Sequence, residues 1–414
     1  MLPPVLEVYV VWHPGDTAGR EAADQIFEHF HGNSFTGLIG GAIEVYVRSE
    51  GWRSIVDAPR PIGYPGSLGA NGLAAPRLVA VVPVLGTELA AAVENNGPWR
   101  AFCRAIIDAQ RAAPDQVGVY PLAVNESAID GTILGQIYGP FQRIAVPAVF
   151  AEPEPPAELR CRDLAQGMAQ LATGSNARLQ VFISHTKRFR HGEEGDVPEL
   201  IALVRTIIGE TRLQQFFDAN DLQPGQDWDD RLRSEASTSA MLAIRTDLYA
   251  SRTWCQREMV IAKRYGMPIV ILDSLGYGEE RGSFLMDHVP RIPVRGQDEN
   301  WSKQDIRRVL NLLVDECLKR ALWNVQKKLA ADKYSLGVSW WAPHAPEPVT
   351  LTQWLDDAQN AGTYAVGDAD LRVLHPDPPL GPDELVVLRQ MMGLMGHRGL
   401  LDVMTPRMLS ARGG

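Results

Sequence analysis

A tryptophan and a glutamate in the middle of the chain stand one helical turn apart. Trp254 and Glu258 fall in the run Ser251–Tyr265, and Ile261 continues the same helical spacing. Side chains at this spacing share one face of a helix. A carboxylate beside a ribose can stabilise the positive charge that develops as a glycosidic bond breaks, and it can also act as nucleophile or base. Glu258 is therefore the candidate catalytic residue, although most glutamates on helices are simply solvated.

The neighbouring segments place this helix in an α/β sheet. The apolar runs Met241–Ile244 before it and Ile269–Leu272 after it are typical of buried strands. We expect Ser251 to be the N-cap of the helix and Gly266–Pro268 to end it. Because sites in such sheets form where the strands end, Glu258 should lie at the carboxyl edge.

A second polar stretch is expected at the same edge. Ser184 to Arg188 follow the apolar residues Val181–Ile183. Ser184 and Lys187 suit a ribose or a pyrophosphate, although loop hydroxyls often cap a helix and basic loop residues are often solvated. The stretch lacks a GxGxxG phosphate cradle, which argues against a redox dehydrogenase.

Three stretches in order resemble the signature segments of the Toll/interleukin-1 receptor (TIR) domain. Val181–Lys187 resembles the first strand and its exit loop, Phe216–Gly225 the BB loop, and Trp254–Glu258 the active-site helix. The resemblance covers about a third of the chain, roughly residues 178–297. It implies a flavodoxin-like doubly wound parallel sheet. The form with Glu258 resembles the TIR proteins that cleave NAD rather than those that only recruit partners.

The resemblance also implies roles for individual residues. Glu258 matches the catalytic glutamate, and Asp218 or Trp228 can contact NAD, with the tryptophan stacking on a base. Trp228 could equally anchor its own loop. NAD+ would be the substrate, so no cofactor is expected, and the scattered histidines predict no metal. The expected NAD-binding residues are Ser184, Lys187, Asp218, Trp228 and Trp254.

Residues 1–150 are expected to be a degenerate TIR-like copy. Their strand–helix alternation predicts a second doubly wound α/β unit. Trp99 would correspond to Trp254, but Cys103 stands where the central domain has Glu258. We therefore expect this unit to have kept the fold without the chemistry, and to serve sensing or assembly.

Particular elements of this first unit can be predicted. Leu78–Val82 is too apolar for a half-exposed strand and should be central. A helix should carry Ala22, Ile26, Phe27 and Phe30 on its apolar face. The other expected strands are Val8–Trp12, Ile43–Val47 and Val117–Val124.

The sequence predicts that the remaining parts of the chain are connecting and docking segments. Prolines make Ala151–Pro156 a stiff, extended linker. About 80 residues at the C-terminus are few for an independent core, so this region should dock on the others. The expected domains are 1–150 (degenerate TIR-like α/β), 151–177 (linker and helix), 178–300 (catalytic TIR), 301–331 (long amphipathic helix) and 332–414 (small α/β C-terminal docking region).

Composition sets further limits. Of the 414 residues, 45% are hydrophobic and 22% charged, as in soluble globular proteins. No apolar run approaches ~18 residues, so we expect no membrane span. Four cysteines without CxxC spacing argue against a disulfide framework or a zinc site and fit the cytoplasm. The net charge of −10 argues against direct nucleic-acid binding.

The resemblance implies an NAD+ glycohydrolase that releases nicotinamide and leaves ADP-ribose or a cyclic form of it. In this family the site often forms between two TIR protomers, so a homo-oligomer or filament is expected, and the bacterial setting is anti-phage, abortive-infection defence. Residues 1–150 or 332–414 could receive a partner protein or an activating ligand. The alternatives are a non-enzymatic TIR scaffold and a cyclase that makes an ADP-ribose-derived messenger. The Trp-Cys-Gln-Arg-Glu run argues against the scaffold.

Overall fold

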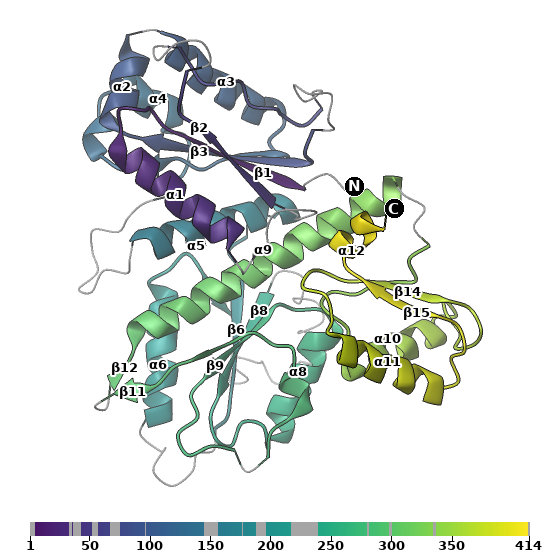
Figure 1. Cartoon of the computed structure of the whole chain (residues 1–414). Helices are drawn as coiled ribbons and strands as arrows, with labels where there is room; N and C mark the ends of the chain where they lie inside the picture. Colours follow the sequence, from purple (N-terminus) through teal and green to yellow (C-terminus); the bar gives the residue numbers. More distant parts are fainter. Residues whose placement is uncertain are drawn as a thin grey trace. The chain divides into compact units, whose positions relative to one another are not determined.

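The protein folds into two compact α/β units, seen here in a computed structural model (Figure 1). Unit 1 comprises Met1–Asn176, Ala321–Tyr334 and Ser410–Gly414, and unit 2 comprises Ala177–Arg320 and Ser335–Leu409. The expected α/β class with parallel sheets is confirmed. The structure describes residues 5–32, 35, 43–51, 57–66, 75–95, 97–144, 156–175, 177–187, 196–216, 239–279, 281–297, 300–333 and 337–412.

The sheet of unit 1 is parallel and has the strand order β2-β1-β3-β4, with β5 pairing the end of β3. Every residue of β3 is buried between its two neighbours, as the apolar run predicted. The expected strand Val117–Val124 is instead two short strands, because Pro121 cannot donate to the ladder. The strands are β1 (Leu6–Val11), β2 (Ile43–Arg48), β3 (Leu78–Leu85), β4 (Val117–Val119) and β5 (Leu122–Ala123).

The helices of unit 1 bury their apolar faces on this sheet. In α1, Ala22, Ile26 and Phe30 are buried, but Phe27 is 43% exposed, so the predicted face was wrong there. Phe27 stacks instead on the ring of His31, one turn further on. The linker Ala151–Pro156 lies outside the described residues except for the first residue of α5. The helices are α1 (Thr17–His31), α2 (Thr87–Glu94), α3 (Pro98–Ala112), α4 (Ile133–Tyr138) and α5 (Pro156–Thr173).

The larger sheet of unit 2 is also parallel, with the strand order β10-β9-β8-β6-β7. The chain moves outward from β6 to β7 and then returns past β6 to β8, so the winding direction reverses between β6 and β8. Ligands bind outside the carboxyl ends of strands at such a reversal. The strands are β6 (Gln180–His185), β7 (Gln214–Phe216), β8 (Ser239–Arg245), β9 (Ile269–Asp273) and β10 (Arg291–Pro293), and the helices α6 (Asp196–Gly209) and α8 (Thr253–Arg264) connect them.

The C-terminal part of unit 2 has a small parallel sheet of its own, in the order β13-β14-β15. Its core includes Leu351, Val373 and Leu388. Its elements are β13 (Trp340–Trp341), α10 (Pro348–Asn360), β14 (Leu371–Leu374), α11 (Pro382–Leu394) and β15 (Leu401–Met404). Helix α9 (Lys303–Lys333) belongs to unit 2 as far as Arg320 and to unit 1 from Ala321, and α12 (Pro406–Ala411) belongs to unit 2 as far as Leu409.

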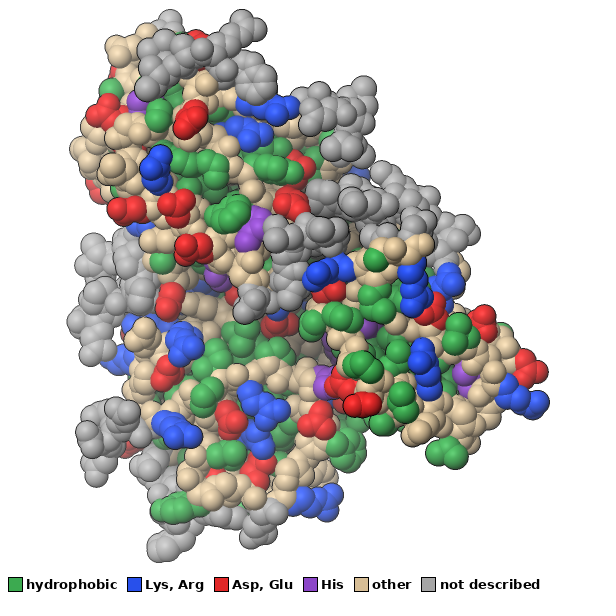
Figure 2. Space-filling model, viewed as in Figure 1, with side chains coloured by type: hydrophobic (Ala, Val, Ile, Leu, Met, Phe, Trp, Pro, Cys, Tyr) green, Lys and Arg blue, Asp and Glu red, His purple; other side chains and the backbone are tan. Residues whose placement is uncertain are grey.

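The surface and the helices limit what the described residues can bind. On the face drawn in Figure 2, basic and acidic side chains are interspersed rather than gathered into large fields of one sign. No helix in the described part of the chain is long and apolar enough to cross a membrane. The same residues contain no group of three or more histidines, cysteines and acids placed to hold a metal ion.

Candidate functional site

Helix α8 begins after a tight turn at the end of β8. Backbone hydrogen bonds from Tyr249 to Thr246 (3.0 Å) and from Arg252 to Tyr249 (3.1 Å) form this turn. Arg252 is the N-cap, without a side-chain cap. The expectation of a Ser251 cap was wrong, because the Ser251 hydroxyl donates back to the Leu248 carbonyl at 2.9 Å. The turn therefore fixes the start of the helix through its backbone.

The first turns of α8 separate an inward carboxylate from an outward indole. Glu258 is only 3% exposed, beside the buried Cys255 and Met259. Trp254 is 43% exposed, and the Arg257 guanidinium lies 6.0 Å from its ring centroid. The predicted shared face thus runs from the surface at Trp254 to the interior at Glu258.

Three side chains from different elements meet at the carboxyl edge of the sheet. The Ser184 hydroxyl, in β6, donates to Oε2 of Glu258 at 2.5 Å. The Tyr249 hydroxyl lies 2.6 Å from the Ser184 oxygen. Because a serine has one hydroxyl hydrogen and Ser184 gives it to Glu258, Tyr249 is the donor in the second bond. The result is a buried chain from Tyr249 through Ser184 to the carboxylate, in which each bond strengthens the next.

Burial keeps the neighbouring acids of this chain neutral. The pKa of Tyr249 lies well above its usual value, chiefly because of burial and further because of the nearby Cys255 and Glu258. Burial, with the charge of Glu258, raises the pKa of the Cys255 thiol to about 12. Cys255 is therefore a thiol at neutral pH and packs in the core rather than serving as a nucleophile. Among these side chains, Glu258 is the one that carries a carboxylate.

A second polar cluster at the same edge organises the loop after β9. The carboxylate of Asp247 accepts backbone N–H groups from Gly276, Tyr277 and Gly278 at 3.0, 2.8 and 3.1 Å. The loop so held exposes 79% of Tyr277. Sequence analysis missed Asp247, although its place just after a buried strand was the available signal.

The adjacent Arg245 ties the same loop to the sheet. Its guanidinium makes two hydrogen bonds to Glu279, at 2.9 and 2.5 Å, and one to Asp273 at 3.5 Å. These bonds, together with those of Asp247, give the rim of the site a defined backbone. Neither Arg245 nor Glu279 was singled out from the sequence.

The structure brings together part of the predicted set. Ser184 contacts Glu258, and Trp254 stands one turn before it. Lys187 lies two residues beyond β6 and is exposed. Asp218 and Trp228 lie outside the described residues. No known family model matches the chain, and no curated protein matches it.

Proposed function

We propose that residues 178–300 form a TIR domain with a flavodoxin-like sheet. Numbered along this segment, its strands lie in the order 2-1-3-4-5, the order of flavodoxin-like doubly wound folds. Unit 1 places its first four strands in the order 2-1-3-4, which supports the proposal of a degenerate TIR-like copy. The three sequence signatures and the strand order are independent observations that favour the same fold.

We further propose that the protein is an NAD+ glycohydrolase, with Glu258 as its catalytic residue. The observation that carries this proposal is the buried Glu258 carboxylate, oriented by Ser184 at the carboxyl edge where β6 and β8 adjoin. Burying a carboxylate is costly, and the hydrogen bond from Ser184 offsets only part of that cost, so its presence there needs a reason. Stabilising a cationic transition state is such a reason.

The proposed reaction breaks the bond between ribose C1′ and the nicotinamide nitrogen. The bonding electrons leave with the nitrogen as neutral nicotinamide, and the ribose develops oxocarbenium character. Glu258 would stabilise that positive charge, as carboxylates do in glycoside hydrolysis. Water then adds to C1′ and loses a proton, giving ADP-ribose, whereas attack by a nucleophile of the same molecule gives a cyclic product. Ser184 and Tyr249 would keep the carboxylate pointed at C1′.

The other binding roles extend this proposal. Trp254 at the rim, the exposed Lys187, Asp218 and Trp228 are the expected contacts to NAD. We propose that activity requires self-association, through which a second protomer completes the site. Bacterial defence against phage is the biological setting that fits such an assembly-gated enzyme.

The deciding experiment measures NAD consumption by the purified full chain, at high concentration and with a crowding agent to promote assembly. Glu258→Gln keeps the shape of the side chain and removes its charge, so turnover should fall by about a hundredfold or more. Glu199→Gln, at an exposed position on α6, is the matched control and should leave turnover unchanged. Equal turnover in the parent and in Glu258→Gln would refute the catalytic assignment. Toxicity of both proteins in cells, with NAD levels followed, separates an inactive scaffold from an enzyme lacking its trigger.

A further inference from the structure

Unit 2 contains a cavity of about 460 Å³ on a different side of α8 from Glu258. The last turn of α8, the segment before β10, α9 and two stretches of the C-terminal part form its wall. Lys263, in this wall, follows Glu258 by five residues, which is about 140° around a helix. The volume of the cavity falls within the range of small-molecule sites, ~300–1,000 Å³. The cavity is thus separate from the proposed catalytic centre.

Most basic groups in this wall already have a carboxylate partner. Lys263 forms an ion pair with Glu347 at 2.7 Å and Lys319 with Glu316 at 2.6 Å, and Nε2 of the His288 ring is hydrogen-bonded to Glu384 at 2.9 Å. Arg320 differs, because its guanidinium makes no hydrogen bond or ion pair to any side chain or backbone group of the described residues. The carboxylate of Glu316, whose charge raises the pKa of Arg320, is engaged by Lys319.

The guanidinium is nevertheless held in place. A Cβ on Gly266 would come within 2.8 Å of Nη1 of Arg320 and within 2.8 Å of Pro343, so this glycine allows a close approach. Burial lowers the pKa of Arg320 to about 10, which leaves it charged at neutral pH. A charged, positioned guanidinium facing a cavity has five donors to offer and no protein acceptor among the described residues.

The surroundings limit the acceptor that would fit. Burial and the charge of Arg320 lower the pKa of His344 to about 3, so this ring is neutral and adds no second positive charge. Nε2 of His344 has no hydrogen-bond partner of good geometry in the described part of the chain. The wall also holds the carboxylates of Asp287 and Asp377, which disfavour a polyanion. Apolar side chains complete it, including Met267, Val289, Pro378, Pro379 and Leu380.

We propose that this cavity binds a small molecule through a single carboxylate group, which pairs with Arg320 while its apolar body packs on the proline-rich wall. Guanidinium and carboxylate form two parallel hydrogen bonds, and a monoanion satisfies the one uncompensated charge without repulsion from the other acids. This site is independent of the proposed NAD cleavage.

The test uses three probes with the same ring on the full-length protein: benzoate, benzamide and phenyl phosphate, with binding followed by ligand-observed NMR titration. Benzoate should bind with a Kd of about millimolar order, as its small size dictates, and about tenfold more tightly than either other probe. Arg320→Met should weaken benzoate binding about tenfold or more, which is the loss of one charge-assisted bidentate pair. Arg308→Met, which removes an exposed cation of α9 outside the cavity wall, is the matched control and should change binding less than about twofold.

Thermal melting of each variant verifies folding. If Arg320→Met does not fold, Arg320→Lys decides the matter, because it keeps the charge but loses the fork and should weaken benzoate binding severalfold. If benzoate does not bind to the parent protein at a concentration of about 20 mM, about twentyfold above a millimolar Kd, the proposal is overturned. So would equal benzoate binding to the parent and to a folded Arg320 variant. Tighter binding of phenyl phosphate than of benzoate would reject the carboxylate assignment.

Discussion

Helices α3 and α8 occupy corresponding places in the two sheets. Each has a tryptophan at its second position, followed four positions later by a second residue of interest, but the two helices place these side chains in different surroundings. In unit 1 these are Trp99, only 2% exposed, and the fully buried Cys103. In unit 2 they are Trp254, 43% exposed, and Glu258. The first pair belongs to a core, the second to the rim and floor of a candidate site.

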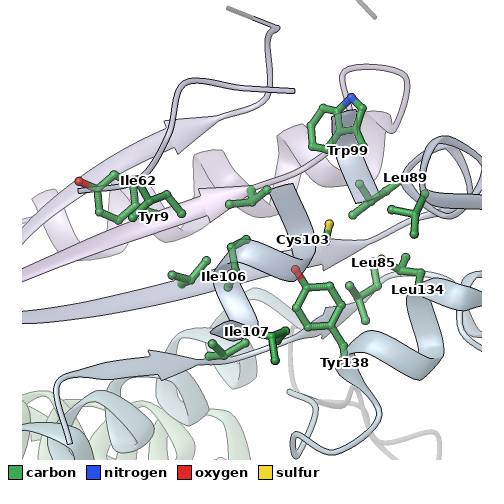
Figure 3. Packing of buried hydrophobic residues seen from close by; sticks show 14 of the residues in the cluster. Tyr9, Ile62, Leu85, Leu89, Trp99, Cys103, Ile106, Ile107, Leu134 and Tyr138 are labelled. Atoms are coloured by element: carbon green, nitrogen blue, oxygen red, sulfur yellow. The ribbon is translucent and has the colours of Figure 1, made fainter. Parts of the chain in front are cut away.

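The difference lies in the groups that surround the second residue. Cys103 belongs to a cluster with Leu85, Ile106 and Leu134, and the Tyr138 hydroxyl points toward it (Figure 3). That hydroxyl has no hydrogen-bond partner of good geometry in the described part of the chain. Glu258, in contrast, receives the Ser184 hydroxyl, itself supported by Tyr249. A buried carboxylate needs supporting donors as well as a helix position. Glu258 is held by a chain of two hydroxyls, whereas a single tyrosine hydroxyl points toward Cys103 within an apolar cluster.

Exchanging Cys103 and Glu258 between the two positions should have the largest effects, one on stability and the other on turnover. Cys103→Glu puts a larger, charged side chain into a packed apolar core in which the Tyr138 hydroxyl is the neighbouring donor, and we expect the free energy of unfolding of unit 1 to fall by about 3–5 kcal/mol. Glu258→Cys should leave the protein folded and lower NAD turnover by about a hundredfold or more. Chemical denaturation and the turnover assay measure the two effects. A Cys103→Glu variant as stable as the parent would show that unit 1 can also hold a carboxylate.

Truncation of the two tryptophans should separate packing from rim function. Trp99→Ala empties a buried site and should cost about 3–5 kcal/mol of unfolding free energy. Trp254→Ala removes a half-exposed side chain and should cost less than about 1 kcal/mol, while it raises the KM for NAD. Denaturation and steady-state kinetics on both variants give the contrast. Similar stability losses at the two positions would contradict the assignment of Trp254 to the rim.

Ser184→Ala tests whether unit 2 depends on its supporting hydroxyls. The variant loses a hydrogen bond to a charged group, worth about 1.5–3 kcal/mol, and kcat should therefore fall about tenfold to a hundredfold with little change in KM. Tyr249→Phe should act in the same direction but less strongly, since it acts through Ser184. A rise in KM at constant kcat would instead identify Ser184 as a direct NAD ligand.

The smallest effect concerns the two cysteines, where the units should behave alike. Burial raises the pKa values of both Cys103 and Cys255 from about 9 to about 12. The folded state thus holds these protons more tightly than the unfolded state, so the stabilisation is present below about pH 9 and is lost as the pH rises toward about 12. Melting temperatures across this range, with Cys103→Ala and Cys255→Ala as references, measure it. Fast reaction of either thiol with a disulfide reagent at pH 8 would contradict the assigned burial.

Local patterns predicted the elements that carry the site but not all of their contacts. The apolar runs at β8 and β9 and the helix between them were evident from periodicity alone. Tyr249 was not singled out, because it lies in a turn and meets Ser184 only when β6 and β8 pair. Ser251 was misassigned as a cap, since a local sequence does not show that its hydroxyl turns back to Leu248. These errors concern hydrogen bonds, whose partners depend on the tertiary arrangement.

By itself the sequence determined the α/β alternation, the buried strands and the one-turn spacing of Trp254 and Glu258, because hydrophobic periodicity and helix geometry are local properties. Only the tertiary structure decided that Glu258 is buried against Ser184 while Cys103 lies in an apolar core. It also decided that Arg320 faces a cavity without a carboxylate partner among the described residues. Burial and hydrogen bonding depend on groups that are distant along the chain, and these set whether a polar side chain is a packed residue, a solvated one or a site.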